Sequence, residues 1–167
     1  MSTTVYIMRH GIAEDRAAGG DDADRQLTSE GRKRVVEIAH GLKELGVKPD
    51  IVLASPLPRA METATLTAAV LDRDLDVETE AALSTGHDAQ KVVAALERCS
   101  GAAEIMVVGH QPQLGDLASI LLTGSPSIVP LPFKKGGVAA IGVDDLPPRY
   151  AGSLRWFMTP KQLRAHS

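Results

Sequence analysis

Two arginines and two histidines lie close behind three short apolar segments of the chain, and their side chains could together bind and transfer a phosphoryl group. The four residues are Arg9, His10, Arg59 and His110. Guanidinium groups supply paired, charge-assisted donors that suit a tetrahedral dianion, and an imidazole can add a further donor. An unprotonated histidine nitrogen is also a nucleophile towards phosphorus, and surrounding cations stabilise the negative oxygens through the transition state.

Each of these residues has a simpler interpretation when taken alone. Arg9 and His10 could be a surface pair at the end of a strand, and His110 could be a hydrogen-bonded core histidine. Arg59 would lie in the first turn of a helix, where the helix dipole disfavours an uncompensated cation, so a bound anion would explain it better. The coincidence of all four residues at three strand ends favours a shared pocket.

The elements that must position these residues alternate along the chain. Short apolar runs are followed by longer amphipathic segments, which is the order expected when crossover helices cover both faces of a largely parallel sheet. The expected strands are residues 5–8, 51–54, 75–78, 104–108, 136–143 and 152–159, the last two as an antiparallel extension of the sheet. The expected helices are residues 29–45, 59–71, 88–98 and 113–122.

This order predicts a three-layer α/β sandwich that forms one domain over residues 1–167. Thr28 is the expected N-cap of the first helix and Gly46 its stop. The apolar stripe of that helix is expected to contain Val35, Ile38, Ala39, Leu42 and Leu45. In an open α/β sheet, ligands bind beyond the carboxyl ends of the strands, which is where the two arginines and two histidines would converge.

Composition excludes several classes of function. The 167 residues are 44% hydrophobic but only 3% aromatic, and the net charge is −3 with no basic block beyond Lys134 and Lys135, so nucleic acid is not an expected partner. The single cysteine, Cys99, excludes an intrachain disulfide and a cysteine-rich zinc site, and is expected to be a small buried residue. With no signal-like start and no apolar run near the roughly 18 residues of a membrane span, we expect a cytoplasmic protein without a membrane partner.

Three motifs in this order resemble those of the histidine phosphatase superfamily, also called phosphoglycerate-mutase-like. They are MRHG at 8–11, SPLPRAMETA at 55–64 and VVGHQP at 107–112. The short length, RQLTSEGRKR at 25–34 and GSLRWFMTPKQL at 152–163 make the chain most similar to the SixA phosphohistidine phosphatases. The resemblance covers nearly the whole chain and implies a central sheet flanked by helices, no metal or other cofactor, and a phosphoenzyme intermediate.

Residue by residue, the resemblance implies that His10 is the nucleophile and becomes transiently phosphorylated. It also implies that Arg9, Arg59 and His110 hold the phosphoryl group, while Gly11 leaves backbone space beside the nucleophile and belongs to the substrate-binding set. Activity should then fall in acid as His10 is protonated, and a profile that stays flat down to about pH 4 would contradict this role.

Two departures from the larger superfamily members bear on the substrate. The chain is too short for their long helical cap insertion, and LSTGHD at 83–88 stands where their glutamate acid would fall. An alkoxide leaving group needs a proton donor, whereas the imidazole of phosphohistidine can already carry a proton. His87 or Asp88 could serve as an acid, but an exposed loop for the first and a helix N-cap for the second are the simpler interpretations.

The leading hypothesis is a metal-independent phosphohistidine phosphatase that acts on a phosphoprotein, such as a histidine-phosphotransfer domain. The alternatives are a phosphomonoesterase of small phosphorylated molecules and a non-catalytic phosphate-binding module. Without a cap insertion the pocket should be open, which suits a protein surface. Lys134 and Lys135 could guide an acidic partner there, although a solvated loop pair is the simpler interpretation.

Overall fold

A six-stranded sheet lies at the centre of the structure, a computed structural model that describes residues 2–15 and 20–167. The strand order is β3-β2-β4-β1-β5-β6. β1 pairs in parallel with β4 and antiparallel with β5, and β5 pairs antiparallel with β6. The last two strands thus form the antiparallel extension of the sheet that the sequence pattern predicted. The strands are β1 (Thr3–Arg9), β2 (Ile51–Ala54), β3 (Val77–Thr79), β4 (Glu104–Gly109), β5 (Val138–Val143) and β6 (Ser153–Met158).

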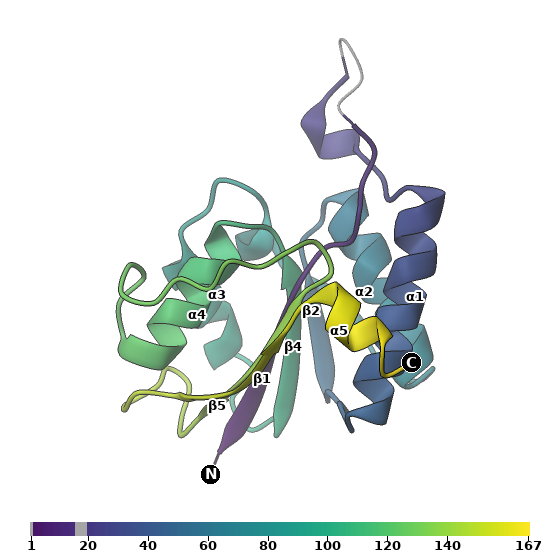
Figure 1. Cartoon of the computed structure of the whole chain (residues 1–167). Helices are drawn as coiled ribbons and strands as arrows, with labels where there is room; N and C mark the ends of the chain where they lie inside the picture. Colours follow the sequence, from purple (N-terminus) through teal and green to yellow (C-terminus); the bar gives the residue numbers. More distant parts are fainter. Residues whose placement is uncertain (1, 16–19) are drawn as a thin grey trace.

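Helices cover both faces of this sheet and complete the predicted three-layer α/β sandwich (Figure 1). α1, α2 and α5 lie on one face, and α3 and α4 lie on the other (Figure 1). The helices are α1 (Ser29–Glu44), α2 (Pro58–Leu71), α3 (Ala89–Glu97), α4 (Gln113–Thr123) and α5 (Pro160–Arg164), with 3₁₀ turns η1 (Asp22–Asp24) and η2 (Ala81–Leu83).

The alternation of side chains along β1 divides the core between the two faces. Tyr6 and Met8 pack in the cluster beneath α1 and α2, while Val5 and Ile7 pack in the cluster beneath α3 and α4. Because both faces of β1 are covered, its sequence is an unbroken apolar run rather than an alternating one. The strand is therefore fixed in the middle of the sheet, and its carboxyl end has a fixed position.

The first helix follows the sequence prediction except at its end. The Thr28 hydroxyl accepts a hydrogen bond from the Gly31 amide at 2.8 Å, as an N-cap should, and Gly46 adopts a positive φ of 81° just past the helix. Leu45 was wrongly placed in the buried stripe: it is the C-cap residue and is 36% exposed. The stripe ends one turn earlier because the helix itself ends at Glu44.

Two other elements and the burial of one residue differ from the prediction. β3 begins two residues later than expected, because the amide of Leu75 is used in a turn with Asp72 and pairing begins at Val77. α5 was not predicted, yet Thr159 begins it with a capping box. Cys99 is only partly buried, and that burial raises the pKa of its thiol.

The carboxyl ends of β1, β2 and β4 come together at one edge of the sheet. The register pairs Arg9 with Gly109 and Ala54 with Val108, so the residues that follow these strands start from neighbouring positions. Across residues 2–15 and 20–167, no helix combines the length and the apolar character that a membrane crossing requires.

Candidate active site

One cavity of about 310 Å³ lies beyond this edge, and all four predicted residues line it. Arg9 and His10 reach it from the end of β1, Arg59 from the first turn of α2 and His110 from the residue after β4. The other lining residues are Asp22, Arg25, Thr85, Gln111 and Lys135. The volume lies at the lower end of the range for small-ligand sites.

His10 is buried and its hydrogen bonding fixes which ring nitrogen carries the proton. Nδ1 lies 2.7 Å from the carbonyl oxygen of Gly11, and a carbonyl can only accept, so Nδ1–H is the donor. Nε2 then keeps its lone pair. Burial, reinforced by the nearby charges of His110 and Arg59, lowers the pKa of His10 to about 3, although the Gly11 hydrogen bond opposes this.

His10 therefore stays unprotonated far into the acid range when the cavity is empty. A pH profile that stays flat down to about pH 4 is compatible with a nucleophilic His10, contrary to the expectation drawn from the unperturbed pKa of histidine.

His110 lies beside His10, with ring centroids 5.2 Å apart. Its Nε2 is 2.8 Å from the Ser55 hydroxyl, whose oxygen also accepts from the Leu57 amide at 3.2 Å. When the Ser55 hydroxyl donates to Nε2, the ring proton is on Nδ1, a buried atom without a partner in the described part of the chain. Burial, and the charge of Arg59 after it, lowers the pKa of His110 to about 4, so the ring is neutral at physiological pH.

The two arginines are each held by terminal guanidinium nitrogens. Arg9 Nη1 donates to the Phe133 carbonyl at 2.9 Å, and Arg59 Nη1 donates to the Asp22 carbonyl at 2.9 Å. The Nε atoms of both arginines are buried and have no partner among the residues that the structure describes. Burial lowers the pKa of both guanidinium groups, but arginine remains charged at any physiological pH.

Asp22 brings a carboxylate into this cationic cavity. Its Oδ2 is 3.3 Å from Arg59 Nη2 and its Oδ1 is 3.0 Å from Arg25 Nη1, while Arg25 Nε donates to the Glu14 carbonyl at 2.5 Å. Sequence reasoning did not single out either Asp22 or Arg25 as a site residue. The run of acidic residues near Arg25 was the one recognisable signal for an ion-pair cluster. Nothing in the sequence indicates that this acidic segment folds back over Arg59.

Gly11 does not line the cavity, and its lack of a side chain instead permits close helix packing. A Cβ on Gly11 would lie 2.6 Å from Val35 Cγ2 of α1, so the missing side chain allows α1 to pack against the end of β1. The Gly11 amide donates to the hydroxyl of Thr63 at 3.0 Å, and that hydroxyl donates to the Arg59 carbonyl at 2.7 Å. Thr63 thus ties the residue after His10 to the turn of α2 that carries Arg59.

Residues 83–88 contribute one side chain to the cavity, that of Thr85. His87 is exposed and Asp88 is the N-cap of α3, where its carboxylate accepts from the Gln90 amide at 2.8 Å. Neither lines the cavity, in agreement with their simpler interpretations. Lys135 does line it, whereas Lys134 beside it does not.

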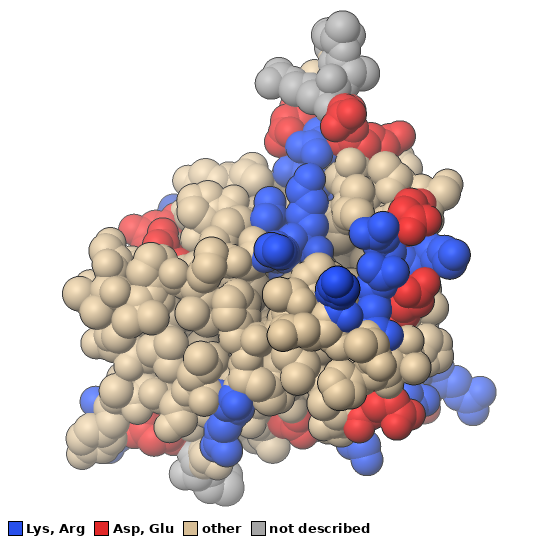
Figure 2. Space-filling view, viewed as in Figure 1, with Lys and Arg blue, Asp and Glu red and all other residues tan. Residues whose placement is uncertain are grey.

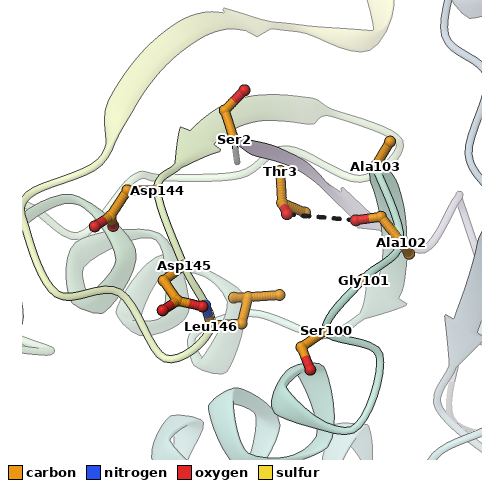
Figure 3. Close-up of a pocket in the computed structure, with 9 residues that line it drawn as sticks. All are labelled: Ser2, Thr3, Ser100, Gly101, Ala102, Ala103, Asp144, Asp145 and Leu146. Atoms are coloured by element: carbon orange, nitrogen blue, oxygen red, sulfur yellow. Dashed lines mark hydrogen bonds between the residues drawn. The ribbon is translucent and has the colours of Figure 1, made fainter.

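A second cavity, of about 260 Å³, lies at the opposite end of the sheet, where β1 begins and β5 ends (Figure 3). Its lining residues are Ser2, Thr3, Ser100, Gly101, Ala102, Ala103, Asp144, Asp145 and Leu146. The only charged side chains in this lining are carboxylates, which repel an anion. Of these two cavities, the one at the carboxyl edge is therefore the one suited to a phosphoryl group.

Residues that could hold a metal ion do not gather at this site. Within residues 2–15 and 20–167, no three His, Cys, Asp or Glu side chains are placed to share an ion. The positive charge that faces the cavity comes from Arg9, Arg25, Arg59 and Lys135.

Comparison with known proteins agrees with this geometry. A model of the histidine phosphatase superfamily (branch 1) matches residues 5–87. A solved structure of the protein histidine phosphatase SixA with tungstate is 31% identical, with a TM-score of 0.84 over 96% of this chain and 99% of that one. An uncharacterised protein of Picosynechococcus sp. is 36% identical over 82% of this chain and 83% of its own length.

More distant relatives share the fold. A mycobacterial glucosyl-3-phosphoglycerate phosphatase is 16% identical, with a TM-score of 0.70 over 95% of this chain and 100% of that one. This likeness extends the common architecture to a phosphatase of a small molecule. The chain is a phosphatase and belongs to the histidine phosphatase superfamily.

Proposed function

We propose that this phosphatase removes the phosphoryl group from phosphohistidine on a partner protein, with His10 as the nucleophile. The observation that carries the proposal is a set of three buried nitrogens around His10 without partners in the described residues: Arg9 Nε, Arg59 Nε and His110 Nδ1. A buried donor without an acceptor is costly, and the oxygens of a phosphoryl group would supply the missing acceptors.

The first step transfers the phosphoryl group to the enzyme. The lone pair of His10 Nε2 attacks phosphorus while the phosphorus–nitrogen bond of the substrate breaks and its electron pair returns to the substrate ring. If the far nitrogen of that ring carries a proton, the ring leaves as neutral imidazole. Arg9 and Arg59 stabilise the negative oxygens through this step.

The second step returns the enzyme to its starting state. Water attacks the phosphorus atom bonded to His10 Nε2, and the bond between phosphorus and Nε2 breaks. The proton that the attacking water loses moves to a phosphoryl oxygen, so inorganic phosphate is released and Nε2 regains its lone pair. The hydrogen bond from His10 Nδ1–H to Gly11 favours the protonated ring as the leaving group, because the carbonyl stabilises the positive charge.

The absence of a free carboxyl group from the described lining of the cavity supports phosphohistidine over an alkyl phosphate ester. The only carboxylate in that lining is Asp22, which is held in ion pairs with Arg25 and Arg59. His110 is neutral at physiological pH. The similarity to SixA, which was solved with the tetrahedral oxyanion tungstate, supports the same substrate class.

Phosphate release from a histidine-phosphorylated phosphotransfer domain tests the proposal. The wild type is compared with His10→Ala and with His40→Ala, a control on the exposed face of α1, and an aryl phosphate is assayed in parallel. We expect rapid loss of phosphohistidine with the wild type and His40→Ala, none above background with a folded His10→Ala, and slow aryl hydrolysis. Aryl turnover without any release from the phosphoprotein would refute the proposal in favour of a small-ester phosphatase.

A further inference from the structure

Lys135 lies in a tight turn that is attached to the backbone of His10. The Gly137 amide donates to the Lys134 carbonyl at 2.7 Å, and Gly136 has a φ of +86°, which together define a type II turn with Lys135 as its second residue. The Gly136 amide lies within hydrogen-bond distance of the carbonyls of Arg9, at 3.1 Å, and His10, at 3.0 Å. The position of Lys135 relative to the nucleophile is thereby fixed.

The Lys135 ammonium is the cation at this cavity that is left for a ligand. It is exposed, lines the cavity, and has no hydrogen bond or ion pair to any residue that the structure describes. Arg25, by contrast, is held by Asp22 and the Glu14 carbonyl. Lys134 is also exposed but does not line the cavity, so the adjacent lysines have different surroundings.

The cavity carries more positive charge than one phosphoryl group needs. Among the described residues, four cationic side chains and one carboxylate line it, a sum of three positive charges, while a phosphoryl dianion supplies two negative ones. Figure 2 shows Lys and Arg gathered in the upper middle of the face that contains the site, with few charged groups over α3 and α4. One unit of positive charge remains for a second anion.

We propose that Lys135 binds an acidic side chain that lies next to the phosphohistidine of the substrate. This inference rests on the proposed function and adds a sequence preference to it: phosphohistidine flanked by Asp or Glu. Lys135 is then a specificity-determining residue, and its effect should weaken with salt because the ion pair is exposed.

Two matched histidine-phosphorylated peptides test the preference, one with Glu and one with Gln on either side of the phosphohistidine. An exposed ion pair contributes up to about 1 kcal/mol, so the wild type should show a kcat/KM about fivefold higher for the Glu peptide at low salt. Lys135→Gln should reduce this ratio to less than twofold. Lys134→Gln, the matched control, should keep the wild-type ratio.

Equal rates on both peptides with the wild type, or a preference that survives in Lys135→Gln, would overturn the inference even if both peptides are hydrolysed. The same variants are assayed on phenyl phosphate and on its 4-carboxyl derivative, which keeps the test independent of phosphohistidine. Hydrolysis of the esters but not the peptides would refute the proposed function. A preference for the carboxylated ester that depends on Lys135 would then still support the second anion site, and no such preference would refute it.

Discussion

Acid should destabilise the folded protein through the two site histidines, and the size of the effect can be estimated from their environment. Burial lowers the pKa of His10 to about 3 and that of His110 to about 4, whereas both titrate near 6.5 in the unfolded chain. Between these values the unfolded state binds more protons, so the free energy of unfolding falls as the pH falls. At pH 5.5 each histidine should lower it by about 1.4 kcal/mol relative to pH 8, or about 3 kcal/mol together.

Urea unfolding at pH 8 and at pH 5.5, in phosphate-free buffer, measures this loss directly. The double variant His10→Asn/His110→Asn keeps polar side chains at the site but cannot titrate there, so it should lose about 3 kcal/mol less than the wild type over this interval. His40→Asn, on the exposed face of α1, should behave as the wild type. An equal loss of stability in the wild type and the double variant would refute the reasoning.

Three further predictions concern the support of the site. Thr63→Val removes the hydroxyl that joins the Gly11 amide to the Arg59 carbonyl, so urea unfolding should show a loss of about 1–3 kcal/mol in the free energy of unfolding. A change below about 0.5 kcal/mol would contradict this role of Thr63. Gly11→Ala places a Cβ 2.6 Å from Val35 Cγ2 and should lower the free energy of unfolding by about 1–3 kcal/mol. Adding Val35→Ala to the same chain should restore most of this loss, and failure of the rescue would show that the strain lies elsewhere. Treatment with EDTA followed by gel filtration should leave turnover unchanged, because guanidinium groups supply the positive charge, and a loss restored by a divalent cation would contradict the mechanism.

The convergence of the four site residues could be predicted because it depends on local pattern and a general property of sheets. Arg9, His10 and His110 follow buried parallel strands, and Arg59 follows one by a short turn, so topology alone brings them to one edge. The central strands were equally predictable, since the runs around Ile7 and Val107 are apolar without interruption.

The remaining cavity residues depend on contacts between distant segments, which no local pattern encodes. Asp22 reaches Arg59 only because the chain before α1 folds back, with Ala13 bridging to Leu27. Lys135 lines the cavity because of a turn whose Gly136 amide bonds to the Arg9 carbonyl of β1, more than 120 residues earlier. Ser55 was noted only as the first residue of the SPLPRAMETA motif, yet its hydroxyl bonds to His110.

The central place of β1 also determines the order in which the site can be assembled during synthesis. β1 precedes the other five strands along the chain, but its two neighbours in the sheet, β4 and β5, begin at Glu104 and Val138. At about 5–20 residues per second, roughly 7 to 27 seconds separate the synthesis of β1 from that of β5. Until β4 has been made, β1 has neither of its partners in the sheet, and the cavity can form only after His110, and then Lys135, has been added to the chain.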